Sequence, residues 1–470
     1  MLLTTAVGEM VIYIPQDSPF LNMGGRVVDS AYEFATSINF FLMQSIYSAF
    51  EIVSVCNLLL TFDINRNSPL LPGLPIAAQI VIFGLINLYA VRWFGIAEFW
   101  FSIAKVLLAI GLIFFTLITM CGGNPQHDAF GFRNWHVDRI MAEMYTTGAL
   151  GRFQSFLYVL RNSSSFTCVG PEYLSMVAGE TINPRRTLSK AFKSILYRLV
   201  VFYIGGALSV TILIAYNDPK YNDIVNNSNS ASSPYVVAMQ NMGISALPYI
   251  VNAVILTSAF SAGSAYVYTS SRCLFNLSKK GFIPRLFSRC NKKGTPYFAV
   301  CGTMCITFLS FMQLGKQGQK AFNYLVNLTT SAQILNYGFM SITYIRFYHA
   351  CIAQKIDRNE FTYKSWFQPY SIYLVCAYYW CLIGILGYQV FMPGKWTVDS
   401  FLFSYIMLFI SIAAYVFWKL FKRQPFVKLR EADLKTGLEE IEEHEYEYEY
   451  YAKSETVERS WLRRLQNWIS

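Results

Sequence analysis

Stretches of about twenty mostly apolar residues recur along the whole chain, and they leave few folds open to it. Only helices and closed barrels satisfy every backbone group inside a bilayer, and a helix needs about twenty apolar residues to cross. By that rule we place ten spans, at 35–62, 74–92, 97–120, 149–177, 195–216, 246–276, 297–315, 322–346, 372–391 and 399–419. The apolar start, 1–14, is too short to cross and has no basic signal-peptide head. The sequence therefore predicts an all-α polytopic membrane protein with about ten full spans plus a partial one.

The charges predict how these spans are oriented. Only 14% of the 470 residues are charged, far below a soluble domain, and the net charge is +10. Most Lys and Arg lie in short hydrophilic links between apolar runs, and four sets of them share one side, which is the positive-inside pattern and argues against nucleic-acid binding. They follow the fourth, sixth, eighth and tenth spans: Arg185, Arg186, Lys190, Lys193; Lys279, Lys280, Arg285, Arg289, Lys292, Lys293; Arg346, Lys355, Arg358; Lys419, Lys422, Arg423. We expect this side, and the C-terminus, in the cytoplasm.

Cysteine and histidine give no sign of a cofactor. The ten cysteines are mostly scattered singly through apolar runs, and the four histidines lie in links or the tail. Neither a disulfide framework nor a zinc spacing results, so no metal or cofactor is expected. The opposite side carries the polar link 217–235, whose Asn226-Asn227-Ser228 is a weak glycosylation pattern.

The chain changes character after residue 420, which predicts a membrane domain, 1–420, and a cytoplasmic tail, 421–470. The tail holds an acidic run with interleaved tyrosines, 439–450, and a basic amphipathic end, 459–468. A solvated tail resting on the anionic inner leaflet explains this composition. Trafficking or ubiquitin machinery are candidate partners.

The fourth span is polar and broken at its centre, where Gly170 and Pro171 precede Glu172. A helix in hydrocarbon can be interrupted only where its freed backbone groups face protein or a wet cavity. Pro171 suits the first position of a second half-helix, and Glu172 would lie in its positive first turn. A substrate site is the first interpretation, and a Pro-kinked packing helix is the second.

Three further ionisable groups lie inside spans, where a charge costs at least ~2.5 kcal/mol, so each is a functional candidate. Glu51 can gain and lose a proton if its surroundings alternate between dry and wet, and Lys105 can lose its proton when desolvated. A fixed ion pair, such as Glu51 with Arg161, is the structural alternative. Arg161 could also extend outward to water.

In collinear order, several motifs resemble the fungal amino-acid permeases of the amino acid–polyamine–organocation superfamily, especially the dicarboxylic, or acidic, amino-acid branch. They are Gly8–Met10, Glu98-Phe-Trp-Phe-Ser-Ile-Ala-Lys105, Gly122–Arg133, Val169–Tyr173, Ala178–Glu180, Asn183–Arg185, Tyr216–Pro219, Ser258–Ser264, Ser271-Arg272 and Phe322–Thr329. The resemblance implies an inverted-repeat (LeuT-like) transporter fold of twelve helices. The ten spans match its third to twelfth helices and 1–14 part of its second, so the chain is expected to be N-terminally truncated and to lack the first.

The resemblance also implies a binding site. Substrate would contact Phe166, Thr167, Cys168, Gly170 and Glu172 on the broken helix. Further lining residues would be Ser261 and Gly263 on the family's eighth helix and Asn327 and Thr330 on its tenth. Glu51 and Lys105 are candidates for proton coupling, and Arg161 for contact with a substrate side chain.

The expected function is secondary active import of amino acids across the plasma membrane by proton symport, with a preference for acidic amino acids. The alternative is a non-transporting nutrient receptor, or a truncated and inactive permease fragment, which the missing first helix and the tail suggest. An enzyme is not expected, because the spans contain no Gly-x-Ser-x-Gly elbow, His–Glu metal pair or phosphate loop.

Overall fold

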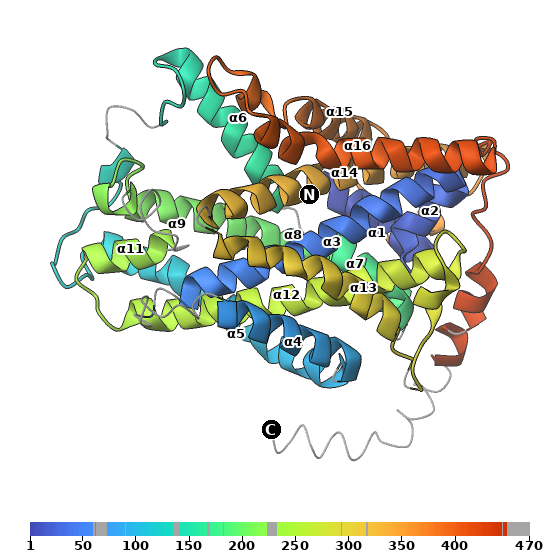
Figure 1. Ribbon diagram of the computed structural model, residues 1–470, viewed down its shortest axis with the longest axis horizontal. Coiled ribbons are helices and arrows are strands. Elements are labelled where there is room, and N and C mark those ends of the chain that lie inside the picture. The colour runs from blue at the N-terminus through green and yellow to red at the C-terminus, as the bar shows by residue number, and fades with distance from the viewer. Residues whose placement is uncertain are drawn as a thin grey trace.

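The computed structural model describes residues 1–59, 62, 73–89, 91–135, 141–166, 170–181, 183–222, 233–292, 294–315, 318–443 and 445–448, and all regular structure among them is helical (Figure 1). The α-helices are α1 (Leu2–Tyr13), α2 (Pro19–Val27), α3 (Ser30–Leu59), α4 (Gly73–Tyr89), α5 (Val91–Met120), α6 (Ala149–Phe166), α7 (Pro171–Val177), α8 (Pro184–Arg198), α9 (Gly205–Leu213), α11 (Pro234–Asn241), α12 (Leu247–Lys279), α13 (Tyr297–Thr307), α14 (Gly318–Ala353), α15 (Tyr370–Gly384) and α16 (Val398–Lys422). Asn226 and the basic end of the tail, 459–468, lie outside the described residues.

Six helical segments among the described residues are long and apolar enough to cross a membrane by themselves. They are Ser30–Leu59, Gly95–Met120, Pro184–Leu213, Leu247–Lys279, Tyr297–Leu314 and Val398–Lys422. The fourth expected span is interrupted, and α4 and α15 are shorter apolar helices. α14 is long, but its interior carries a series of polar residues that lowers its hydropathy.

The fifth expected span begins earlier than 195. α8 starts at Pro184, at the first helical position after Asn183, and runs through a π-helical turn, Leu199–Ile204, into α9. The first part of this helix was not predicted, because α8 contains basic residues and the spans were placed from apolar runs. The helix is therefore longer than its apolar run.

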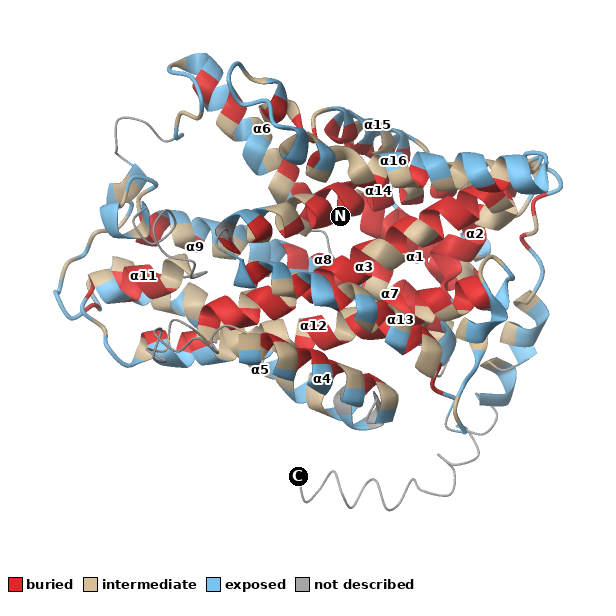
Figure 2. Ribbon diagram, in the orientation of Figure 1, coloured by how far each residue is buried: buried red, intermediate tan, exposed pale blue. Residues whose placement is uncertain are grey.

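α3 lies at the centre of the molecule, where it packs against α12, α14 and α16. Buried residues concentrate on α3, α1, α2, α7 and α12, whereas α4, α5 and α16 show many exposed positions (Figure 2). Only 6% of the most apolar window of α5 is buried, with Phe99, Trp100 and Leu107 pointing outward. Apolar side chains on an outer surface are what a bilayer requires.

The long helices run between two ends of the molecule. α3 begins at one end, where α12, α14 and α16 finish, and we call this end the tail face. There the Lys280 ammonium pairs with Glu33, and Lys419 Nζ lies 2.6 Å from Asp29 Oδ2. At the opposite face, where α14 and α16 begin, Lys320 Nζ lies 3.1 Å from Asp399 Oδ2.

Candidate functional site

The helix break expected in the fourth span is present. α6 ends at Phe166, and α7 begins at Pro171, which takes the first helical position. Gly170 precedes it with φ of 149°, in a region that side-chain-bearing residues rarely adopt. The second interpretation, a continuous helix with a proline kink, is therefore wrong. Thr167 and Cys168, two of the expected substrate contacts, lie outside the described residues.

Glu172, in the first turn of α7, is bound to α14. Its side chain is buried, and its Oε1 accepts hydrogen bonds from Gln333 Nε2 at 2.9 Å and from the Tyr337 hydroxyl at 3.3 Å. Its Oε2 accepts a bond from the Gly170 N–H at 3.4 Å. Sequence reasoning missed both partners on α14, although their spacing of four residues places them on one helix face. The carboxylate thus joins the start of the half-helix to α14.

A row of polar side chains winds around α14, spaced three residues apart: Asn327, Thr330, Gln333 and Asn336. Asn327 is bonded to Arg161 of α6 and Gln333 to Glu172 of α7, so these two members face the broken helix. Thr330 Oγ1, Gln333 Oε1 and both amide atoms of Asn336 are buried and have no hydrogen-bond partner among the described residues. Such groups cost about 1–3 kcal/mol each when they stay unpaired. Two of the expected substrate contacts, Asn327 and Thr330, belong to this row, which is suited to a polar ligand or to water.

Aromatic rings form another side of this region. Phe166, the last residue of α6, meets the ring of Tyr47 edge-on at 6.1 Å, and Tyr47 stacks on Tyr266 at 5.0 Å. The Tyr47 hydroxyl is buried without a hydrogen-bond partner among the described residues. Phe166 was expected at the site, whereas Tyr47 and Tyr266 were not. Their rings combine an apolar surface with one free polar group.

Arg161 lies one and a half turns before the end of α6, and its side chain is only 4% exposed. Its Nη2 donates a hydrogen bond to Asn327 Oδ1 at 2.5 Å, while Nε has no hydrogen-bond partner in the described part of the chain. It forms no ion pair with a carboxylate of the described residues, so the expected alternative pair with Glu51 is wrong. The outward path to water is also wrong, because the side chain turns inward to α14. The guanidinium can therefore form an ion pair with an anionic ligand.

A second polar cluster joins α5 to α12. Lys105 Nζ donates to Glu98 Oε1 at 3.0 Å and to Ser261 Oγ at 3.1 Å, and the Ser261 hydroxyl donates to Glu98 Oε2. Glu98 was missed as a site residue, although it precedes Lys105 by two helical turns on the same face. The fixed ion pair considered for Lys105 thus exists, but with Glu98.

Glu51 lies on α3 beside this cluster. It is half-buried and within electrostatic reach of Lys105, and it forms no ion pair with the described residues. Gly263 allows α12 to approach it closely, because a Cβ there would lie 3.2 Å from Glu51 Cβ and 2.8 Å from the Phe83 ring. Both Glu51 and Glu172 are within electrostatic reach of the stacked Tyr47 and Tyr266. The two polar clusters are thereby connected.

Comparison with known proteins gives a match along nearly the whole chain. The family model for amino acid permeases matches residues 1–431. The general amino acid permease AGP2 of Saccharomyces cerevisiae is 38% identical over 467 residues, which cover 96% of this chain and 77% of the relative.

Other relatives carry different substrate names. A proline-specific permease of Emericella nidulans is 37% identical over 98% of this chain and 83% of its own length. The dicarboxylic amino acid permease of Saccharomyces cerevisiae is 35% identical over 94% of this chain and 72% of its own length. The similarity is thus spread over permeases of several named substrates.

Proposed function

Because this chain belongs to the amino acid permease family, we propose that it imports amino acids across the plasma membrane by proton symport, with a preference for acidic amino acids. Membership of the family supports amino-acid transport by a multi-pass membrane protein, and the family's permeases are transporters rather than enzymes. The direction, the coupling ion and the preference are the proposal.

The break between α6 and α7 is the observation that carries the proposed binding mode. The last carbonyls of a helix and its first N–H groups lack helical partners, and they have the opposite polarities that bind an ammonium and a carboxylate. At the break these are the carbonyls that end α6 and the N–H groups of Glu172 and Tyr173, because Pro171 has no N–H and the Leu174 N–H donates to Gly170 O. Buried Glu172 and the polar row of α14 add side-chain donors and acceptors. A zwitterion bound between α6, α7 and α14 would satisfy groups that are otherwise unpaired.

Arg161 supports the acidic preference. It is a buried cation within reach of the α14 row, and its Nε has no hydrogen-bond partner among the described residues. A second carboxylate on the substrate would pair with it, whereas a neutral side chain would leave the charge unpaired at a cost of several kcal/mol.

The cluster of Glu98, Lys105 and Ser261 supports proton coupling, with Glu51 as the neighbouring proton acceptor. One proton gained or lost in this cluster changes the ion pair between Lys105 and Glu98, and with it the hydrogen bonds that join α5 to α12. Protonation and helix movement would then be linked.

The fold and orientation extend the same proposal. An inverted-repeat arrangement, with substrate at the helix break, would place the tail face in the cytoplasm, as the Lys and Arg of its links require.

Uptake of radiolabelled amino acids in permease-deficient cells tests the proposal. We expect uptake that increases at lower external pH, with aspartate and glutamate taken up more than asparagine and glutamine. Surface biotinylation controls for expression. A chain that reaches the surface and takes up no amino acid would overturn the proposal and favour the alternative of a non-transporting receptor.

A further inference from the structure

The chain after α16 crosses the tail face as a strap, which we define as the described residues between 425 and 448. Its first part is anchored on rigid elements. The Val427 N–H donates to Val28 O at 2.8 Å, and Arg346 Nη2 donates to Val427 O at 2.5 Å. Gln354, after α14, donates to Ala432 O at 2.7 Å, and Leu434 is 1% exposed. Backbone hydrogen bonds and two buried residues, Ala432 and Leu434, therefore hold this part on the tail face, although most of its other residues are exposed.

Hydrogen bonds and charge keep the middle of the strap in place. Arg26 on α2 donates to Thr436 O at 3.0 Å and lies 3.8 Å from the Asp433 carboxylate. Burial acts to raise the pKa of Asp433, but hydrogen bonds from the backbone and side chain of Thr436, with the charge of Arg26, hold it below its ordinary value. Asp433 consequently stays ionised near neutral pH.

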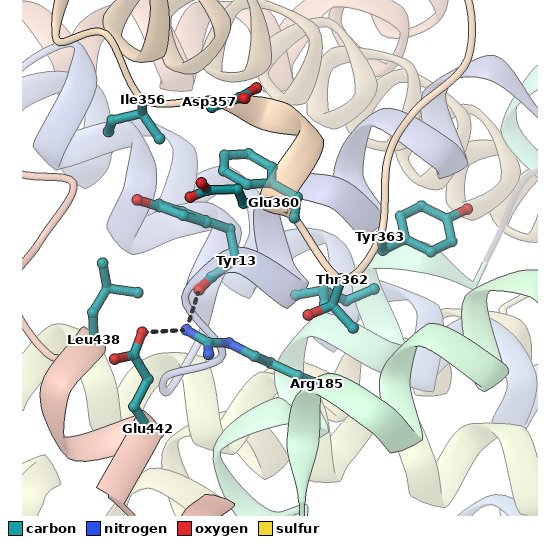
Figure 3. A pocket seen from close by; sticks show the side chains of 11 residues that line it. Tyr13, Arg185, Ile356, Asp357, Glu360, Thr362, Tyr363, Leu438 and Glu442 are labelled. Atoms are coloured by element: carbon teal, nitrogen blue, oxygen red, sulfur yellow. Dashed lines mark hydrogen bonds and ion pairs between the residues drawn. The ribbon is translucent and has the colours of Figure 1, made fainter.

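The second part of the strap is helical and lies over the start of α8. Arg185 Nη1 is 3.2 Å from Glu445 Oε2. Its Nη2 is 3.8 Å from Glu442 Oε1 (Figure 3). The same guanidinium donates to Tyr13 O at the end of α1. Leu438 and Ile441 pack against the hydrophobic core. Arg185 is thus the point where strap, α1 and α8 meet.

Two cavities lie between this helical part and the membrane domain. One, of about 220 Å³, is lined by α1, Arg185, the link after α14, Leu438 and Glu442. The other, of about 460 Å³, is lined by the junction of α7 and α8, including Ala178, Gly179 and Pro184, with Ile441 and Glu445 of the strap. The strap therefore bridges hollows in the tail face beside α7, where its contacts are incomplete.

α7 and its junction with α8 are the elements that lead from the helix break to the tail face. α7 has only seven residues, and it reaches α8 through a short 3₁₀ turn and Asn183, whose φ is 49°. A substrate that moved from the break to the tail face would have to displace α7, its junction with α8, or the neighbouring α1. The strap ties them to α2 and α14 and so opposes that displacement.

We propose that the strap is an inhibitory contact that holds the tail face closed and is released when Glu442 and Glu445 leave Arg185. This inference rests on the proposed transport function only where uptake is the quantity measured. Breaking the two ion pairs weakens a closed arrangement without touching the residues beside the break. The transporter then opens more often on this side, and its turnover rises.

The test is the double variant Glu442→Gln/Glu445→Gln, compared with Glu439→Gln/Glu440→Gln. The control pair removes the same charge from the same helix, but Glu439 and Glu440 are exposed, and their side chains make no hydrogen bond or ion pair in the described part of the chain. We expect the first variant to raise the maximal uptake rate about two- to fivefold, the scale of one or two exposed ion pairs. The control is expected to match the wild type at equal surface level.

A second readout needs no transport. Thr181→Cys places a thiol in the larger cavity. A maleimide is added to membranes whose tail face is accessible to the reagent, and peptide mass spectrometry measures how fast this thiol is labelled. We expect Glu442→Gln/Glu445→Gln to speed labelling by the same two- to fivefold, with no change in the control. Equal labelling in the two double variants, or a lower uptake rate after loss of Glu442 and Glu445, overturns the inhibitory strap. Absence of uptake in every variant would count against the transport function alone, because labelling still tests the strap.

Discussion

Glu172 is the residue through which the broken helix is held to its surroundings. Its two oxygens accept from a side-chain amide, a hydroxyl and a backbone N–H, and none of these donors is charged. A buried polar group that loses its hydrogen-bond partners costs about 1–3 kcal/mol. The direction of the first turn of α7 is therefore sensitive to the chemistry of this one side chain.

We predict that Glu172→Gln lowers uptake about tenfold or more while the protein still reaches the cell surface. Glutamine keeps the shape, but its NH₂ group would face donors, so at least one contact to Gln333, Tyr337 or Gly170 is lost. A loss of about 1.4 kcal/mol in the transition state corresponds to a factor of ten. Uptake per surface molecule is the measurement, with exposed Glu439→Gln as the control. Normal uptake by Glu172→Gln would remove this carboxylate from the site.

Arg161 and Arg152 lie on the same helix and form a matched pair for substrate selectivity. Arg161 is buried and bonded to Asn327, whereas the half-exposed Arg152 pairs with Glu143 at 3.8 Å. We predict that Arg161→Gln lowers uptake of glutamate at least about tenfold relative to glutamine, because a buried carboxylate would lose its cation. Arg152→Gln should leave that ratio unchanged. Competition between labelled glutamate and unlabelled glutamine measures it, and an unchanged ratio in Arg161→Gln would show that no substrate anion binds there.

Among the helices, the break was predictable because its causes are local in sequence. Gly170, Pro171 and Glu172 are consecutive, and each has a known place at the start of a half-helix. The partners of Glu172 could not be derived in the same way, since Gln333 lies 161 residues away. The polar residues of α14 are present in the sequence at a three-residue spacing, but only the fold shows that Asn327 contacts α6 and Gln333 contacts α7. The partner of Lys105 was within reach, because Glu98 and Lys105 lie on one helix two turns apart.

The connection between α5 and α12 gives a prediction at this scale. Lys105→Ala removes the ammonium that joins Glu98 to Ser261, so we expect uptake that no longer rises as external pH falls. Lys105→Arg distinguishes a lysine that gains and loses a proton from one that only supplies a fixed positive charge. Arginine keeps the charge but does not lose its proton, so it abolishes coupling only if Lys105 itself titrates.

Uptake measured across a range of external pH, together with medium alkalinisation, gives the result for both variants. Lys220→Ala, at an exposed lysine between α9 and α11, is the control. A normal pH profile in Lys105→Ala would exclude Lys105 from coupling. A normal profile in Lys105→Arg alone would make it a fixed cation that positions Glu98.

For the whole molecule, hydropathy and charge predicted the class of protein and most helix positions, because the bilayer acts on each span separately. The start of α8 was missed because it lies in a charged stretch, and the strap was missed because an acidic run in isolation is typical of a solvated tail. Its docking depends on Arg185, which is more than 250 residues away in sequence and lies on the same face only after folding: the Arg185–Glu445 contact spans 260 residues. Composition predicts the properties of single segments, whereas contacts between distant segments can be identified only in the folded structure.

The orientation of the whole molecule can be tested with cysteines that it already has. Cys121 follows α5 at the opposite face, and Cys290 lies in the basic link after α12 at the tail face; both are free and exposed. A cytoplasmic tail face follows from the positive-inside rule, so a membrane-impermeant maleimide should label Cys121 but not Cys290 on intact cells, and both after permeabilisation. Peptide mass spectrometry separates these sites from the exposed cysteines of the apolar helices α13 and α15, Cys301, Cys305 and Cys381. Cys121→Ser and Cys290→Ser identify the two signals. Labelling of Cys290 on intact cells would place the strap outside, and neither the proposed direction of transport nor a cytoplasmic contact that restrains it would survive.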